Sequence, residues 1–289
     1  MQNVIVFSQR YNHEDEAYVA VLLDSLKELG YRVYVNREFY QKLSKTNGFN
    51  VHILEKNQDL DAKSVITLGG DGTILNATKW LNKTSIPILG INLGRLGFLA
   101  SIEKNTIKSA IMQWHNGEYG TEERTLLKLV SKPEIFSDFP FALNDFTLHK
   151  KETSSMITIK TFLDDEYLNT YWADGLIVST PTGSTGYSLS CGGPIVFPNT
   201  GNFIITPVAP HNLNVRPIIV PDNSTIRFEL DGRTNSYLCT LDSRYETVEQ
   251  HFELKVSKAD FKIKMIILKG ESFMKTIREK LSWGLDRRN

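Results

Sequence analysis

The pattern of apolar and polar positions divides the chain near residue 120. Before that point, short apolar runs alternate with segments in which apolar side chains recur every three or four positions. The runs predict buried strands, and the periodic segments predict helices with one apolar face. The expected strands are Val4–Phe7, Tyr31–Val35, Val65–Leu68 and Ile86–Ile91, and the expected helices are Glu14–Leu29 and Thr73–Leu81. Such alternation is typical of an α/β domain with a parallel sheet.

The later part of the chain is mostly β, because short runs rich in β-branched and aromatic residues are separated by turn residues. Two pairs, Asp164-Asp165 and Asp231-Gly232, have the composition of hairpin turns. Near the end the helical pattern returns at Phe273–Leu281, with Ser272 as its expected N-cap. The predicted strands of this region are Met156–Leu163, Tyr167–Tyr171, Leu176–Ser179, Phe203–Pro207, Thr225–Leu230 and Phe261–Leu268.

Composition excludes several classes of protein. Lys plus Arg and Asp plus Glu both total 33, so no overall positive charge points to nucleic acid. No apolar stretch is long enough to span a membrane, and we expect no membrane or nucleic-acid partner. The two cysteines, Cys191 and Cys239, lack metal or redox spacing, which indicates a reducing compartment. We therefore expect a cytoplasmic protein.

The first candidate for chemistry is Gly69-Gly70-Asp71-Gly72-Thr73, which directly follows the run Val65–Leu68. Glycines between a strand and a helix let a phosphate approach backbone N–H groups. A turn built only for phosphate would not contain the negative charge of Asp71. The carboxylate therefore suggests chemistry on a hydroxyl group, either as a base or as an orienting acceptor. At this position it would lie beyond the carboxyl end of a parallel strand, where ligands bind in such sheets.

Three further segments are rich in polar groups. Hydroxyls and glycines fill Asp174–Ser188, and Tyr187 within it could stack on a base or a nicotinamide, although a surface loop can have the same composition. Asn144-Asp145 could bind an adenine edge or a ribose diol, or simply form a bulge or turn. The spaced glycines of Gly90–Phe98 suit a tight crossover near a nucleotide or close packing between the two lobes, and packing is favoured.

Other familiar sites are missing from the sequence. It has no GxxxxGK[ST] loop, no GxGxxG with an acid downstream, and no GxSxG serine setting. His211 has no second ligand at metal spacing, so we expect no metal-binding residues.

Together these segments resemble the bacterial NAD kinases in order and spacing, over nearly the whole chain. The glycine-aspartate motif alone is shared with lipid kinases and phosphofructokinases, whereas the long Asp174–Ser188 motif is far more specific. The matching segments are Leu68–Thr73, Gly90–Leu99, Leu143–Asp145, Asp174–Ser188, Arg216–Pro221 and Glu271–Phe273.

The resemblance implies an α/β N-terminal domain with a parallel sheet, a mostly β C-terminal domain, and a C-terminal helix packing back on the first domain. The expected bounds are residues 1–104, 105–268 and 269–289. It also implies transfer of the γ-phosphoryl of ATP, with Mg²⁺, to the 2′-hydroxyl of the adenosine ribose of NAD. A homodimer or homotetramer is expected from the family, with exposed strand edges of the second domain as contact surface.

By resemblance, Asp71 takes or orients the 2′-hydroxyl proton, Gly72 lies against the same nucleotide, and Asn144 and Asp145 hold the ribose and adenine. Trp172 stands where relatives often carry a polar or basic residue, and we expect it to affect the preference for NAD over NADH. The remaining residues expected in the dinucleotide site are Ser155, Asp174, Thr185, Gly186, Tyr187, Ser188, Leu189 and Ser190.

The sequence departs from the family at other places as well, and one of them is Asn144-Asp145, where the family usually has Asn-Glu. Relatives usually have Ala where Gly186 stands, and Asp242-Ser243-Arg244 replaces a triplet such as Asp-Gly-Gln, which puts a contact from Arg244 in doubt. Two other functions stay open. One is a kinase for another alcohol, a lipid or a sugar, and the other is a sensor that binds NAD without catalysis.

Overall fold

The computed structural model describes residues 2–9, 12–43, 49–56, 58–151, 155–231 and 236–282. The chain forms two compact units. Unit 1 comprises Met1–Glu123 with Ile263–Asn289, and unit 2 comprises Arg124–Lys262. Strands β7 (Tyr119–Lys132) and β18 (Glu253–Leu268) each run from one unit into the other. The domain bounds expected from the sequence therefore stay a prediction.

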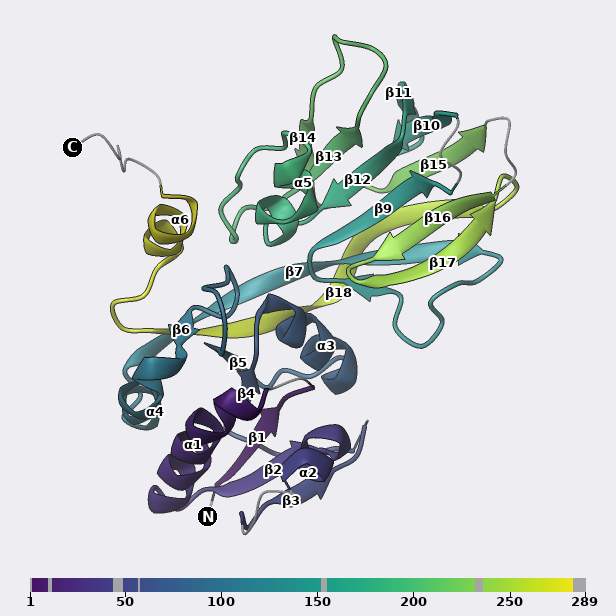
Figure 1. Ribbon diagram of the computed structural model, residues 1–289. Coiled ribbons are helices and arrows are strands. Elements are labelled where there is room, and N and C mark those ends of the chain that lie inside the picture. The colour runs from purple at the N-terminus through teal and green to yellow at the C-terminus, as the bar shows by residue number, and fades with distance from the viewer. Residues whose placement is uncertain are drawn as a thin grey trace, which may run out of the picture. The chain divides into compact units, whose positions relative to one another are not determined.

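Unit 1 is built on a parallel sheet (Figure 1), in the strand order β5-β4-β1-β2-β3. Registers such as Val6↔Ile66 and Ile66↔Leu89 are parallel, and every residue of β4 and β5 is buried, as expected for strands covered on both faces. The last part of β18 adds to β5, with Met265 opposite Ile88. The other strands are β1 (Asn3–Phe7), β2 (Arg32–Asn36), β3 (His52–Leu54), β4 (Val65–Leu68), β5 (Ile88–Asn92) and β6 (Ile102–Glu103).

Helices cover this sheet. Helices α1 (Glu16–Glu28) and α4 (Ile107–His115) contact each other and share one apolar cluster with the sheet, to which Leu26 and Trp114 belong. Helix α3 (Asp71–Leu81) contacts β4 and β5. The remaining helices are α2 (Arg37–Leu43) and the 3-10 turns η1 (His13–Asp15) and η2 (Lys104–Thr106). Buried apolar surface of this kind supplies most of the stability of helices of this length.

The C-terminal helix α6 (Phe273–Leu281) packs on unit 1 as expected. Its N-cap is Ser272, whose hydroxyl accepts a hydrogen bond from the N–H of Lys275 at 3.2 Å. The rings of Phe273 and Phe98 lie 6.4 Å apart. The Nζ atom of Lys280 donates to the carbonyl of Leu96 at 2.7 Å. These contacts join the end of the chain to the loop that follows β5.

Unit 2 is a pair of antiparallel sheets around one core, and the C-terminal region is mostly β as predicted. One sheet has the order β14-β13-β12-β9-β16-β17, and the other contains β11-β10-β15-β18 with β7 and β8. Phe146 and Phe228 come from different sheets and stack at 5.3 Å in this core. The strands are β8 (Phe141–Ala142), β9 (Asp145–Lys150), β10 (Ile157–Leu163), β11 (Glu166–Ala173), β12 (Gly175–Ser179), β13 (Asn202–Val208), β14 (Ile218–Pro221), β15 (Ile226–Asp231), β16 (Ser236–Leu241) and β17 (Arg244–Glu249).

One predicted hairpin is confirmed and one is wrong. Asp164 and Asp165 both have positive φ and join the antiparallel pair β10–β11. The pair Asp231-Gly232 is not a hairpin turn, because β15 and β16 lie in different sheets. Gly232 itself lies outside the described residues. Turn composition marks a change of direction, but it does not decide whether the flanking strands pair with each other.

Candidate functional site

Asp71 is the first residue of α3 and follows β4 after two glycines. Its Oδ2 accepts a hydrogen bond from the N–H of Phe98 at 2.8 Å. Its Oδ1 accepts from the N–H groups of Leu99 and Ala100 at 3.1 and 2.9 Å. The negative charge also lies in the first turn of a helix, where the helix dipole favours an anion. Asp71 is thus fixed by three backbone donors of the loop after β5.

Gly97 makes this arrangement possible. A Cβ at Gly97 would lie 2.7 Å from the carboxyl carbon of Asp71, far inside van der Waals contact. The same loop is held by Asn92, whose Oδ1 accepts from the N–H of Gly94 at 2.7 Å. Packing between the lobes was the favoured prediction for Gly90–Phe98 and stays a prediction, whereas within unit 1 the loop packs closely against the candidate catalytic carboxylate. Sequence reasoning did not find this relationship.

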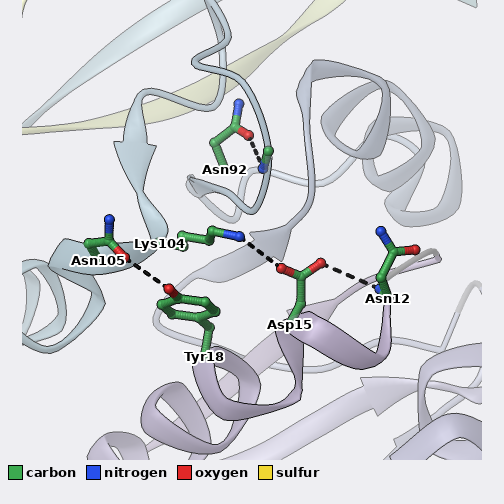
Figure 2. Close-up of polar contacts among 7 residues, drawn as sticks. Asn12, Asp15, Tyr18, Asn92, Lys104 and Asn105 are labelled. Carbon is green, nitrogen blue, oxygen red and sulfur yellow. Dashed lines mark hydrogen bonds and ion pairs between the residues drawn. The ribbon is translucent and has the colours of Figure 1, made fainter.

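Figure 2 shows a second set of polar contacts in unit 1. The Nζ atom of Lys104 pairs with Asp15 at 3.1 Å, and Asp15 also accepts from the N–H of Asn12. The hydroxyl of Tyr18 donates to Asn105 at 3.0 Å. These bonds join the start of α1 to the turn before α4, so they hold neighbouring elements of unit 1 together.

In unit 2, the backbone of Asn144 and Asp145 is held by a buried carboxylate. Asp242 accepts from the N–H of Asn144 at 2.8 Å and from that of Asp145 at 3.3 Å, and also from Leu143. The N–H of Thr180 donates to the carbonyl of Asn144 at 2.9 Å. The pair is therefore a rigidly bonded turn leading into β9. Within the segment Asp242-Ser243-Arg244, Asp242 makes these bonds, while Arg244 donates to the backbone carbonyls of Phe139 and Phe141.

The titration of these two carboxyl groups follows from their burial. The pKa of Asp145 is raised to about 7, mainly by burial and also by the nearby charge of Asp242, while a hydrogen bond from Thr147 opposes the shift. Burial also raises the pKa of Asp242, against the opposing effect of its three backbone donors and of Arg244. Two carboxyl groups this close do not easily carry two charges, so Asp145 and Asp242 titrate as a coupled pair.

Asp174 and Tyr187 lie beside the paired strands β9 and β12. Asp174 forms an ion pair with Lys150 at 2.6 Å. The hydroxyl of Tyr187 is hydrogen-bonded to Nε2 of His149 at 2.8 Å. The charges of Asp145 and Asp174 both raise the pKa of Tyr187, after the larger effect of burial. Tyr187 therefore lies within electrostatic reach of two further residues that the sequence assigns to the site.

The segment after β12 presents some of its polar groups to solvent and buries others. It forms the short turn η3 (Gly183–Thr185) and the single helical turn α5 (Tyr187–Ser190). Gly186, Tyr187 and Ser190 are exposed, and Thr185 and Leu189 are partly exposed. Ser188 is fully buried, and its hydroxyl pairs with that of Thr206 at 2.8 Å.

The remaining predicted residues lie elsewhere in the structure. Trp172 is on β11, and its ring lies 4.4 Å from that of His211. Ser155 is partly buried and lies two residues before the start of β10. Gly72 is in α3 next to Asp71, and both residues belong to unit 1. The other predicted residues belong to unit 2.

The fold and the site residues define a class of protein. A parallel α/β unit carries a carboxylate in a glycine turn at the end of a strand, and a β unit carries exposed hydroxyls, an aromatic ring and carboxyl groups. Among the described residues, no group of three or more His, Cys, Asp or Glu side chains is arranged to hold a metal ion. This combination is that of a nucleotide-dependent phosphotransferase.

Comparison with known proteins specifies the family. Residues 4–119 match the model of the ATP-NAD kinase N-terminal domain, and residues 143–268 match that of the ATP-NAD kinase C-terminal domain. The chain belongs to the ATP-NAD kinase family. It is 47% identical to the NAD kinase of Cytophaga hutchinsonii, over 96% of this chain and 97% of that one. It is 40% identical to an NAD kinase of Bacteroides fragilis, over 98% of both chains.

Solved structures agree with this assignment. A crystal structure of yeast NADH kinase complexed with NADH matches with a TM-score of 0.86 and 26% identity, covering 99% of this chain and 89% of that one. An NAD kinase from Archaeoglobus fulgidus in complex with ATP has the same fold, with a TM-score of 0.73 and 24% identity, over 98% of this chain and 99% of that one. Within the described residues, no helix is long and apolar enough to cross a membrane.

Proposed function

We propose that the protein is an NAD kinase in which Asp71 orients the 2′-hydroxyl of the adenosine ribose of NAD toward the γ-phosphoryl of ATP. Phosphorylation of NAD to NADP with ATP is the activity of its full-length relatives. The observation that carries the role of Asp71 is its fixed carboxylate, which accepts three backbone hydrogen bonds at the end of β4.

The bonding of Asp71 favours an orienting acceptor. A carboxylate has about four lone-pair positions, and three of those of Asp71 are taken by backbone donors. One position on Oδ2 stays available for the proton of a substrate hydroxyl. Phosphoryl transfer has a loose transition state, so a hydroxyl held in line with the phosphorus needs little removal of its proton beforehand.

Unit 2 supplies the proposed dinucleotide contacts. Asn144 and Asp145 hold the ribose and adenine, since their backbone is already fixed by Asp242 and Thr180. The exposed ring of Tyr187 stacks on a flat heterocycle, and Asp174 accepts from ribose hydroxyls. The other proposed contacts are those of Ser155, Trp172, Thr185, Gly186, Leu189 and Ser190. The buried hydroxyl of Ser188, which was also expected in the site, pairs with Thr206 and supports this turn from inside.

Mg²⁺ enters the proposed reaction with ATP. The described residues offer no cluster of three acidic or metal-binding side chains. This fits a metal held mainly by substrate phosphates and water, which is the usual binding mode of Mg²⁺. Bound in this way, Mg²⁺ would neutralise charge on the phosphates while Asp71 orients the hydroxyl.

We also propose a homodimer or homotetramer, built through unit 2. The edge strand β14 presents Ile219, 48% exposed, and the preceding loop presents Leu213, 84% exposed. An edge strand with apolar side chains is a natural contact surface for a second copy. Light scattering of the purified protein tests the oligomer, and a monomer at working concentration would contradict it.

The two free cysteines support a reducing, cytoplasmic location.

The deciding experiment is NADP formation from NAD, ATP and Mg²⁺ by wild type and Asp71→Asn. The product is checked by mass and by its 2′-phosphate. Asp24→Asn, on the exposed face of α1, is the matched control. We expect Asp71→Asn to lose activity by about 10²- to 10⁴-fold and Asp24→Asn to retain it. If a folded wild type binds NAD without making NADP, the protein is a sensor. If it binds no NAD, lipid and sugar alcohols are the acceptors to test.

A further inference from the structure

The side chain of Tyr187 is held from one side by His149. Nε2 of His149 and the hydroxyl of Tyr187 are 2.8 Å apart. The two rings are nearly parallel, with centroids 6.1 Å apart and 15° between their planes. Tyr187 is 40% exposed and is the first residue of the single helical turn α5. The hydrogen bond from His149 of β9 therefore restricts the rotation of a ring that is partly open to solvent.

The neighbouring strand leaves room for this imidazole. Gly175 of β12 lies opposite His149 in the antiparallel ladder. A Cβ at Gly175 would be 3.0 Å from Cδ2 and 3.1 Å from Cγ of His149, and 2.5 Å from the carbonyl oxygen of Leu148. A larger residue at Gly175 would therefore crowd the backbone of β9 as well as the imidazole. The lack of a side chain at Gly175 leaves room for His149 in its present position.

The surroundings of His149 favour its neutral form. Burial lowers the pKa of His149, the charge of Asp174 raises it and that of Lys150 lowers it. Asp174 and Lys150 also pair with each other at 2.6 Å. A neutral imidazole has one ring nitrogen that can accept a hydrogen bond, so Nε2 can accept one from the hydroxyl of Tyr187.

We propose that His149 is a positioning residue for the NAD site, which sets the affinity for the dinucleotide by holding the ring of Tyr187 in its stacking position. This inference rests on the proposed placement of Tyr187 in that site. A ring that is already fixed loses less conformational freedom when a ligand stacks on it. His149 therefore acts on NAD binding through Tyr187, and this proposal gives it no contact with ATP.

The test compares His149→Ala, Tyr187→Phe and the double variant. Tyr187→Phe keeps the ring and removes the same hydrogen bond from the other partner. Immobilising a side chain costs about 0.5–1.5 kcal/mol, so we expect the KM and the calorimetric Kd for NAD to rise about 2- to 12-fold in each single variant. Because the two single variants remove the same hydrogen bond, the double variant should bind NAD no more weakly than the weaker-binding single variant. The kcat and the KM for ATP should stay within about twofold of wild type.

Two further variants complete the test. In His149→Gln, an amide can still bond the hydroxyl, so part of the affinity should return. His251→Ala is the control, because His251 is an exposed histidine of unit 2 whose ring lies against Phe252. It should leave every parameter unchanged.

Unchanged NAD affinity in both single variants would overturn the proposal. So would a loss of NAD affinity in the double variant that equals the product of the two single losses. Calorimetry keeps this outcome separate from a failure of the proposed function. A wild type that binds NAD but forms no NADP refutes the kinase while the role of His149 is still measured. A wild type that binds no NAD refutes both.

Discussion

Gly97 and Asp71 lie so close that a methyl group on Gly97 would reach to 2.7 Å from the carboxyl carbon of Asp71. The two residues are far apart in the sequence, yet the loop after β5 wraps its N–H groups around this carboxylate. The position of the candidate catalytic group therefore depends on the absence of a side chain in another motif.

Replacing Gly97 by alanine should reduce activity strongly. The added methyl must displace either the carboxylate or the loop, and a displacement near 1 Å of a positioning group costs on the order of 10²-fold in rate. Gly94→Ala is the matched control in the same loop, because a Cβ there would meet only Oδ1 of Asn92, at 3.8 Å. Steady-state rates of NADP formation measure both variants. Equal rates for the two variants would show that activity does not depend on the position of the Asp71 carboxylate.

Replacing Asp242 by asparagine should destabilise unit 2. The carboxylate accepts from three backbone N–H groups, and an amide offers one oxygen in place of two. Leaving a buried donor without its acceptor costs about 1–3 kcal/mol in the free energy of unfolding. Urea unfolding followed by circular dichroism measures the change.

Asp164→Asn is the control for Asp242→Asn. Asp164 also has positive φ in a hairpin and accepts a single backbone hydrogen bond, from Thr225 at 2.8 Å, but it is exposed. Asparagine tolerates that backbone conformation, so the change should stay within about 0.5 kcal/mol. A loss as large as that of Asp242→Asn would mean that burial of the carboxylate is not the cause.

Stability should fall between acid and neutral pH because of Asp145. Its pKa is raised from 3.8 to about 7 in the folded protein. Between these two values the folded state binds more protons at Asp145 than the unfolded chain does, so the free energy of unfolding decreases as pH rises. At about 1.4 kcal/mol per pKa unit, the contribution lost by pH 8 is a few kcal/mol. Urea unfolding at pH 5 and pH 8 should show a smaller decrease in Asp145→Asn than in wild type, and an equal decrease would refute the assignment.

Tyr237→Phe should stabilise the protein. The ring of Tyr237 is fully buried in the core of unit 2, and its hydroxyl has no hydrogen-bond partner among the described residues. Removing an unsatisfied buried hydroxyl should raise the free energy of unfolding by about 1 kcal/mol. Tyr31→Phe is the contrasting variant, because the hydroxyl of the buried Tyr31 is hydrogen-bonded to His115 at 2.9 Å and accepts from Lys63 at 3.0 Å. The melting temperature should rise for Tyr237→Phe and not for Tyr31→Phe. A lower melting temperature for Tyr237→Phe would contradict the prediction.

Some elements were predictable because local pattern and tertiary environment agree. The runs Val65–Leu68 and Leu176–Ser179 are mostly apolar and have a glycine at one end, and both are buried strands in the structure. The helix at Phe273–Leu281 was predictable from its serine cap. The long strand β7 was not predicted, because charged residues interrupt its apolar positions and its burial alternates. The wrong hairpin at Asp231-Gly232 shows the same limit, since pairing is decided by which sheet each strand joins.

The sequence by itself determined the kinds of element, the order of the motifs and the family, because periodicity, turn residues and motif spacing are local properties of the chain. Only the tertiary structure decided that Asp71 is held by the loop of Gly97, that Asp242 holds Asn144 and Asp145, and that His149 holds Tyr187. These pairs are brought together by strand order and register, and a hydrogen bond between distant residues leaves no periodic signal in the sequence.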